Sequence, residues 1–384
     1  MKYNILVLTD IHWGAIDPDT QYDDLEQVFI FLKEFHDIDL IVIGGDYFDS
    51  KLSLNSKASI LSVQWMERLI TESETCGVKK IRVIKGTQEH DNSQLEVFRE
   101  KESERFKIFN TNTVEETLPD MKCIYCPDEN INAKDYKDIY IDNILSGASI
   151  GFFHGSFDIV LPDIVVQMSE DSSLKSMIFE YDFWSKFISG PMIAGHWHSG
   201  VEIDDLIYVG SYERWAFGES DPKGFGVVRF DTDSNEYIYH KIENSFADIY
   251  ETVEINTSLY KNLSDYKALM TKVDAMCADY TDNIYIRIVI NVDDDKVDND
   301  TFITSLRHYF INNKKIKIVL KDKLKKKKAK EEKQHHIETK TKYGFVTDKS
   351  LSEAQKIQEY ISVTKQKDIP IDVIESFIQK YLNN

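Results

Sequence analysis

The sequence has few cysteines, no long apolar run and a shortage of positive charge. Its 384 residues contain four cysteines, at positions 76, 123, 126 and 277, too few for the disulfide framework of a secreted protein. No apolar stretch approaches the roughly 18 residues that a membrane-spanning helix needs. The N-terminal apolar run meets Asp10 too early for a signal peptide. We therefore expect a cytoplasmic protein that has no membrane partner.

The deficit of positive charge limits how this protein could bind nucleic acid. Lysine and arginine number 46 against 66 aspartates and glutamates, so the formal net charge is −20 at pH 7. Because Lys and Arg at phosphates supply most of the affinity for nucleic acid, this balance excludes indiscriminate coating of a polyanion. If the partner is DNA, local basic patches or a second subunit must provide the positive field.

Two of the cysteines have the spacing of half a zinc site. Cys123 and Cys126 lack a second Cys/His pair at a suitable distance, and they lie in a strand-like run that ends at Pro127. We interpret them as two semi-buried thiols rather than as metal ligands.

Apolar runs alternate with amphipathic stretches in the first part of the chain. The runs at 4–9, 40–43 and 81–84 are rich in Ile, Leu and Val, the pattern of strands buried on both faces. Apolar residues at helical spacing separate them, at 21–36 and 56–75. We therefore predict parallel strands joined by right-handed crossovers.

The pattern continues as α/β and then loses its helices. The next predicted elements are a helix at 95–105, a strand at 121–126, a helix at 135–145, and strands at 148–153 and 191–195. After these, only turns separate three further strands, at 201–209, 226–230 and 237–242. This change predicts an antiparallel second sheet packed beside the first.

From about residue 248 the sequence predicts a compact accessory α/β domain without a cluster of metal ligands. Its elements are strands at 249–255, 284–292 and 316–320 and helices at 263–280 and 298–310. A lysine-rich stretch follows at 321–333, with four consecutive lysines at 325–328. Its lack of apolar periodicity predicts a flexible basic linker, either a solvated tether or an arm that touches DNA.

The C-terminal residues predict two short amphipathic helices, at 351–364 and 370–382. The second has an apolar stripe made of Ile371, Ile374, Phe377, Ile378, Tyr381 and Leu382. A tethered helix pair cannot bury such a stripe on itself alone. Docking on a partner is favoured over folding back on the core.

Aspartate and histidine residues follow five of the predicted strands. The carboxyl ends of strands in an α/β sheet form the usual ligand-binding edge, so these residues predict one shared pocket. A lone histidine is ordinarily a core or surface residue, but five of them with carboxylates at strand ends predict a dinuclear metal site. The mixture of imidazole and carboxylate suits manganese, iron or zinc better than magnesium or calcium. The residues are Asp10, His12, Asp46, His90, Asp91, His154, His196 and His198.

These residues permit hydrolysis of a phosphoester. Asp46 follows two glycines, which let the backbone pass close to two ions that its carboxylate could bridge. Asp10 and His12 project toward one ion, His154 projects toward the other, and His196 and His198 share both. His90 is better suited to protonate the departing alkoxide, since a histidine can give a proton at physiological pH. Asp91 is expected to orient its ring or that of a neighbour.

The motifs Asp10-x-His12, Gly45-Asp46, His90-Asp91, His154-Gly155 and Gly195-His196-x-His198 resemble those of the calcineurin-type metallophosphoesterase superfamily. Residues 210–225, which run Gly-Ser-Tyr-Glu-Arg-Trp and end in Lys-Gly-Phe, resemble the segment after the last metal motif in the SbcD and meiotic-recombination-eleven nuclease subunits. The short chain is similar to a compact, phage-type version. The resemblance implies an α/β fold: a two-sheet sandwich flanked by helices, with a small α/β capping domain and a C-terminal helical tail.

The resemblance also implies an order of domains. Residues 1–247 would form the nuclease domain, 248–320 the capping and DNA-recognition domain, 321–349 the basic linker, and 350–384 a helical segment that binds an ATPase. That partner is an SbcC-type coiled-coil ABC ATPase, and the chain would act on DNA as a homodimer.

A ligand set follows from the same resemblance. Two Mn²⁺ ions are implied, with Mg²⁺ a weaker substitute. One ion would be held by Asp10, His12, Asp46 and His198, and the other by Asp46, His154, His196 and one residue of the loop after Gly86. His90 matches the family's catalytic histidine.

The loop after Gly86 departs from the family pattern. The family has Gly-Asn-His-Asp, whereas this chain has Thr87, Gln88 and Glu89 between Gly86 and His90, which makes the loop two residues longer and leaves it without Asn. We predict that Gln88 replaces the Asn ligand, because its amide oxygen is the same kind of donor. Glu89 would bind metal more tightly and attract phosphate less.

Three hypotheses follow. The first is a manganese-dependent DNA nuclease, both exonuclease and endonuclease, of an SbcCD-like repair and recombination complex. The second is a stand-alone phosphoesterase that acts on a protein or a small metabolite, which leaves the accessory domain and the tail without a task. The third is a non-catalytic scaffold, which His90 and the other metal positions count against.

Overall fold

A computed structural model of the chain describes residues 1–35, 37–161, 178–259, 284–292, 316–322, 351–365 and 369–381, with scattered residues between 265 and 308. The chain divides into two compact units. The first comprises Met1–Thr252 with Cys277–Ile286, and the second comprises Val253–Met276 with Arg287–Asn384.

The first sheet of the first unit has six strands in the order β14-β13-β1-β2-β3-β4. Its four parallel strands are β1 (Lys2–Leu8), β2 (Leu40–Gly44), β3 (Lys80–Ile84) and β4 (Phe106–Phe109). Two more strands join at the β1 edge, where β13 (Gly224–Asp231) is antiparallel to β1 and to β14 (Tyr237–Glu243). The sheet is therefore mixed.

The second sheet also has six strands, in the order β11-β12-β10-β7-β6-β5. Its members are β5 (Thr113–Leu118), β6 (Met121–Cys126), β7 (Ile150–His154), β10 (Met192–Gly195), β11 (Val201–Ile203) and β12 (Leu206–Tyr208). The four central strands are parallel, and an antiparallel strand closes each edge. A separate parallel pair consists of β8 (Ser156–Phe157) and β9 (Ile178–Phe179).

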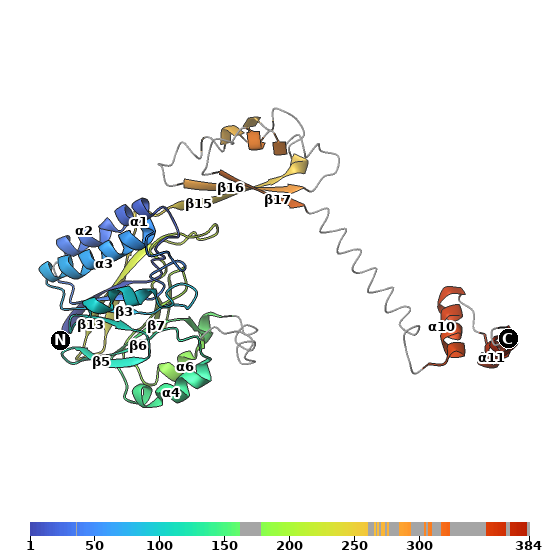
Figure 1. The fold of residues 1–384 in the computed structure, drawn as a ribbon, viewed down its shortest axis with the longest axis horizontal. Coiled ribbons are helices and arrows are strands. Elements are labelled where there is room, and N and C mark those ends of the chain that lie inside the picture. The colour runs from blue at the N-terminus through green and yellow to red at the C-terminus, as the bar shows by residue number, and fades with distance from the viewer. Residues whose placement is uncertain are drawn as a thin grey trace. The chain divides into compact units, whose positions relative to one another are not determined.

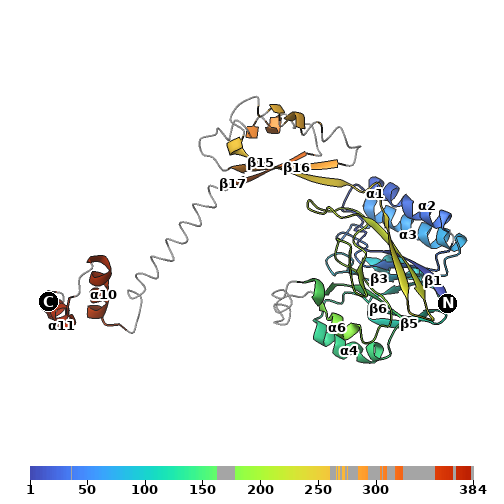
Figure 2. The same cartoon turned by 180° about the vertical axis from the view of Figure 1, so that it is seen from behind.

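Helices cover the outer faces of both sheets. Outside the first sheet lie α1 (Pro18–Asp24), α2 (Glu26–Glu34) and α3 (Lys57–Thr75), and outside the second lie α4 (Ala133–Leu145) and α6 (Tyr181–Trp184) (Figures 1 and 2). The start of α3 is fixed by Ser56, whose hydroxyl accepts a hydrogen bond from the amide of Ser59. Short 3₁₀ helices occupy Gln94–Lys101, Asp158–Val160 and Thr257–Leu259.

The alternation along β1 explains the layered core. Leu6 and Leu8 pack with the helices of the first sheet, whereas Ile5 and Val7 face the second sheet. Successive side chains on a strand point to opposite faces, so an uninterrupted apolar run fills two cores at once. A third core lies between the second sheet and its helices. The predicted two-sheet α/β sandwich flanked by helices is confirmed.

Several predicted elements differ in the structure. The antiparallel strands do not form a sheet of their own, because β13 and β14 extend the first sheet and β11 and β12 join the second. The predicted strand at 201–209 is broken by a turn at Asp204, whose φ is 50°. The helix expected at 21–36 is two helices that meet at Leu25. The helix expected at 95–105 is the 3₁₀ helix at Gln94–Lys101, and β4 begins at Phe106.

The two cysteines of the Cys-x-x-Cys pair lie in β6 and are fully buried, not semi-buried as predicted. Burial raises the pKa of the Cys123 thiol to about 12. Among the described residues, neither cysteine belongs to a group with the spacing of metal ligands.

Beyond the sandwich, a three-stranded sheet has the order β15-β16-β17, formed by Ile249–Asn256, Ile284–Val292 and Ile316–Asp322. The two C-terminal helices are confirmed as α10 (Glu353–Lys365) and α11 (Ile371–Tyr381). The basic linker, apart from its first two residues, and most of the two predicted accessory helices lie outside the described residues. In the described part of the chain, no helix has both the length and the apolar character to cross a bilayer.

Candidate metal centre

The predicted ligands come together where β1, β2 and β3 of one sheet and β7 and β10 of the other end. His154 is the last residue of β7, and the other ligands lie in the loops that follow the remaining strands. Four of them have left-handed backbone: φ is 53° at Asp10, 50° at His12, 46° at Asp46 and 90° at His196. This conformation costs about 1–2 kcal/mol for a residue with a side chain, and such strain is concentrated at functional sites.

Glycines allow these loops to approach one another. A Cβ on Gly45, whose φ is +94°, would collide with the imidazole of His154. A Cβ on Gly86 would collide with the backbone and carboxylate of Asp46. Glycine is therefore required at both positions if Asp46 is to lie between the strands of the two sheets.

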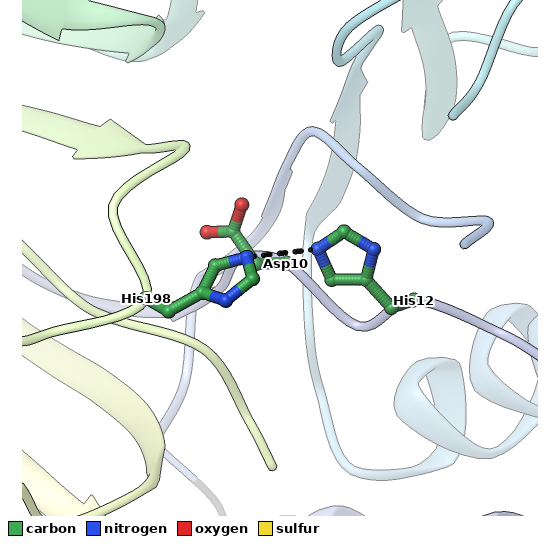
Figure 3. Close-up of side chains that lie close together, drawn as sticks. All are labelled: Asp10, His12 and His198. Atoms are coloured by element: carbon green, nitrogen blue, oxygen red, sulfur yellow. Dashed lines mark hydrogen bonds between the residues drawn. The ribbon is translucent and has the colours of Figure 1, made fainter. Parts of the chain in front are cut away.

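One group of candidate ligands consists of Asp10, His12 and His198, whose ligand atoms all lie within 4.8 Å of one another. Figure 3 shows the rings of His12 and His198 meeting at their edges beside the Asp10 carboxylate, joined by a hydrogen bond. Their Nε2 atoms are 3.1 Å apart. Both carboxylate oxygens of Asp10 accept hydrogen bonds from the amide of His196, at 3.0 and 3.1 Å. The strand end after β10 thus orients the carboxylate that follows β1.

A second group consists of Asp46, His154 and His196. The Nδ1–H of His154 donates to the carbonyl of Gly44 at 2.8 Å, which leaves Nε2 directed at Asp46 Oδ2, 3.2 Å away. The charge of Asp46 outweighs the effect of burial and raises the pKa of His154 to about 10. The reciprocal attraction overcomes the burial of Asp46 and lowers its pKa far below the usual range.

Asp46 also belongs to a third group, with His12 and His90. One carboxylate therefore lies between the histidines of the first group and those of the second, as a bridging ligand must. His90 Nε2 lies 4.0 Å from Asp46 Oδ2, and its Nδ1 is hydrogen-bonded to the carbonyl of Asp49.

These residues fit a pair of divalent ions. The Nε2 of His154 is fully buried and lies 3.2 Å from Asp46 Oδ2 without a well-aligned hydrogen bond. Two carboxylates and four imidazoles supply the mixed oxygen and nitrogen donors that first-row transition metals accept. A divalent ion beside the Nε2 of His154 would supply that buried nitrogen with a partner.

Residues behind the ligands hold their rings. His198 Nδ1 lies 3.4 Å from Glu219 Oε1, and this contact, together with Lys223, lowers the pKa of Glu219 to about 2 despite its burial. The Asp49 carboxylate lies 3.6 Å from His12 Nδ1, and that imidazole lowers the pKa of Asp49. Such outer partners orient metal-binding histidines.

Asp91 ties two loops together. Its carboxylate is fully buried and accepts hydrogen bonds from the amides of Phe48, at 3.0 Å, and of Gly86, at 2.7 Å. Burial and the nearby charge of Asp46 raise its pKa to about 7. The residue predicted to orient an imidazole thus turns its oxygens to backbone amides and joins the loops that contain Asp46 and His90.

The three residues between Gly86 and His90 make different contacts. Thr87 donates to Asp46 Oδ1 from its amide, at 2.6 Å, and from its hydroxyl, at 3.0 Å. Gln88 is exposed, and its amide oxygen accepts a hydrogen bond from Asn130 at 2.8 Å. Glu89 is exposed as well. The assignment of Gln88 as a ligand stays a prediction.

Sequence reasoning gave no role to several residues that contact the ligands. They are Asp49, Trp215, whose ring lies 5.5 Å from that of His12, Glu219 and Lys223. The last three belong to residues 210–225, whose resemblance to nuclease subunits was the one available signal.

Comparison with known proteins supports the reading of this centre. Residues 3–234, more than half of the chain, match the sequence model of calcineurin-like phosphoesterases. The match covers every predicted metal ligand and His90. No curated protein matches the chain.

Proposed function

Because the chain belongs to the calcineurin-like phosphoesterase family, metal-dependent hydrolases of phosphoester bonds, we propose that it is a manganese-dependent DNA nuclease. It cleaves phosphodiester bonds as an exonuclease and an endonuclease within an SbcCD-like repair and recombination complex. The metal centre supports hydrolysis of a phosphoester in general, and the DNA substrate is the finer part of the proposal.

The single observation that carries the DNA substrate is the position of residues 210–225. This segment resembles SbcD-type nucleases in sequence, and it packs directly on the metal centre. Thr9 Oγ1 donates to the carbonyl of Gly210 at 2.9 Å, and the amide of Ser211 donates to the carbonyl of His198 at 3.0 Å. The part of the chain with the most specific resemblance thus forms a wall of the site.

The residues have distinct tasks in this proposal. Asp10, His12, Asp46, His154, His196 and His198 hold the ions, which when bound bind phosphate oxygens and bring the pKa of a water near neutrality. In its doubly protonated form His90 protonates the departing sugar oxygen: its Nδ1 is engaged by the carbonyl of Asp49, so the proton on Nε2 is the one transferred. Thr87 and Asp91 keep the loops of Asp46 and His90 together.

The test uses two substrates and the purified full chain. Linear duplex DNA and bis-para-nitrophenyl phosphate are incubated with manganese, with Asp46→Ala as the inactive control. We expect manganese-dependent degradation of the duplex and release of nitrophenolate, both absent in the variant. Hydrolysis of the small ester with no action on DNA under any condition, including addition of the ATPase, would favour a stand-alone phosphoesterase.

We also propose that α10 and α11 dock on an SbcC-type coiled-coil ABC ATPase and that the nuclease works as a homodimer. In α11, which contacts α10, Ile374 of the apolar stripe is already buried and Ile371 is partly exposed, so the docking proposal rests on the sequence resemblance. Deletion of residues 350–384 should leave hydrolysis of the small ester unchanged and abolish ATP-dependent stimulation of DNA cleavage. Retained stimulation by the ATPase would refute the docking role, and sedimentation of a monomer would refute the dimer.

A further inference from the structure

His198 is contacted by two side chains from the segment that follows it, Glu219 and Lys223. We propose that these residues are a positioning pair that fixes the imidazole of His198 for metal binding. The inference rests on the metal centre of the family and is independent of whether DNA is the substrate.

The pair contacts His198 at its ring and at its backbone. Glu219 Oε1 lies 3.4 Å from His198 Nδ1, and the Lys223 ammonium donates to the carbonyl of His198 at 2.7 Å. Lys223 Nζ also lies 2.7 Å from Glu219 Oε2. One lysine therefore fixes both the backbone of the histidine and the carboxylate that its ring contacts.

The surroundings of the pair make it costly to maintain. The Lys223 side chain is fully buried and that of Glu219 is 15% exposed. A second carboxylate oxygen, on Asp221, lies 3.4 Å from the ammonium. Burial of an ion pair gives little net stability, because desolvation of the charges offsets their attraction. Stability alone therefore does not account for this pair beside His198.

The contact determines which ring nitrogen of His198 is free. When Nδ1–H donates to Glu219, Nε2 has the lone pair that a metal requires. That Nε2 faces the centre, 3.1 Å from the Nε2 of His12 (Figure 3). Glu219 thereby selects the tautomer and the ring orientation of His198. Lys223 fixes the position of Glu219 relative to the backbone of His198.

Two double variants separate positioning from structural support, because both remove the buried charges. In Glu219→Gln/Lys223→Met an amide oxygen can still accept the Nδ1 proton, whereas in Glu219→Leu/Lys223→Met the side chain at position 219 cannot. Asp221 loses the ammonium in both variants but is 24% exposed and keeps hydrogen bonds from Ser199 and Gly200, so both are expected to fold, which circular dichroism would verify. Glu74→Leu, at an exposed position of α3, is the matched control.

The readout is manganese binding by the full chain, measured by isothermal titration calorimetry with manganese chloride. We expect Glu219→Leu/Lys223→Met to bind one ion about 10- to 100-fold more weakly. Glu219→Gln/Lys223→Met should recover most of that affinity, and Glu74→Leu should match the wild type. In ¹⁵N-histidine spectra without metal, His198 should be protonated at Nδ1 in the wild type and in the Gln variant, but not uniformly in the Leu variant.

Equal manganese affinity in both double variants, whether unchanged or reduced, would overturn the positioning role. Should either double variant fail to fold, Glu219→Asp withdraws the carboxylate while keeping its charge, and unchanged affinity in that variant would overturn the role as well. Since metal binding is measured, failure here leaves the nuclease proposal standing. A wild-type protein that does not cleave DNA would likewise leave the positioning pair standing.

Discussion

At the scale of single residues, the role of His90, His154 and His198 depends on the partner of the ring nitrogen Nδ1. His154 donates to the carbonyl of Gly44 and His198 contacts Glu219, so in both rings the other nitrogen is left for a metal. His90 contacts the carbonyl of Asp49, and its Nε2 is 4.0 Å from Asp46 Oδ2. A phosphoester bound by ions that Asp46 would hold would lie within reach of that nitrogen.

This arrangement predicts that loss of His90 depends on the leaving group. His90→Gln should slow DNA hydrolysis by about 10²- to 10⁴-fold, because the sugar oxygen must be protonated as it departs. Hydrolysis of bis-para-nitrophenyl phosphate should fall far less, since nitrophenolate is a stable anion that leaves without a proton. The two kcat values check this prediction. An equal loss on both substrates would instead indicate that His90 binds metal.

The glycines beside the ligands give a second prediction. Gly45→Ala places a methyl group against the ring of His154, at a φ of +94°. Gly218→Ala is a matched control, because its φ of +112° is equally unfavourable and nothing lies within 4 Å of the added atom. The control should cost about 1–2 kcal/mol of backbone strain. Gly45→Ala should lose more stability than the control, measured by thermal unfolding, and should also lose manganese affinity, measured by calorimetry. Identical behaviour of the two variants would contradict this prediction.

The ligands themselves could be predicted from the sequence because each follows an apolar run that ends in a polar residue. Their supporting residues could not. Asp49 is an acid in a loop with no local signature, and the resemblance of residues 210–225 gives no role to Glu219 itself. Only the tertiary structure brings these acids to His12 and His198. The contacts of the loop after Gly86 could not be predicted either. Thr87 binds Asp46 and Gln88 binds Asn130, and no apolar periodicity in the sequence distinguishes these two positions.

At the scale of elements, residues 210–225 lock the start of β15. Glu213 Oε1 accepts hydrogen bonds from the amides of Arg214, at 2.6 Å, and Asp248, at 2.7 Å. Arg214 returns a hydrogen bond to the carbonyl of Asp248 at 3.0 Å. Both backbone groups of the residue before β15 are thus held by the segment that forms a wall of the metal centre.

The buried carboxyl of Glu213 makes the stability of this lock depend on pH. Burial first, and then the charge of Asp248, raises its pKa from 4.5 to about 8. The folded state therefore keeps a proton that the unfolded state releases between these values, so stability falls as pH rises through this window and the loss is complete above it. Asp24, with a pKa raised to about 7, acts in the same direction.

Glu213→Gln should flatten this dependence. The amide has no proton to lose, and its oxygen can accept the same two backbone hydrogen bonds. Urea unfolding of the metal-free protein at pH 5, 6, 7 and 8 should show a shallower decline than in the wild type, with the exposed Glu74→Gln as control. If the stability of the wild type and of Glu213→Gln declined with pH in parallel, the carboxyl group of Glu213 would not titrate in this pH range.

Helices and strands could be predicted where apolar periodicity determines them. The neighbours of a strand in its sheet could not be predicted in this way. The strands that became β1, β2 and β3 and the helix α3 were predicted within a few residues, since burial on one or both faces leaves a direct pattern. The partner of β13 was not, because its apolar residues suit either sheet. Val228 and Phe230 lie between the sheets together with Ile5 and Val7, and only this packing places β13 beside β1.

At the scale of the whole molecule, charge is distributed unevenly along the chain. The formal net charge is −20, yet residues 325–328 are four consecutive lysines. An acidic body repels a duplex, so a nuclease of this composition needs a local cationic element or a partner to hold its substrate. The lysine-rich stretch is the strongest candidate that the sequence offers.

Replacing the four lysines at 325–328 by glutamine tests this role. In the inactive Asp46→Ala background, the slope of log affinity against log salt for a labelled duplex should become less steep by up to about 3.6, since each phosphate contact contributes about 0.9. Fluorescence anisotropy across a salt series measures it. In the active protein, hydrolysis of bis-para-nitrophenyl phosphate should be unchanged, because that substrate is too small to reach beyond the metal centre. Identical salt slopes would mean that the stretch is only a tether, and that an acidic nuclease depends on its ATPase for the grip on DNA.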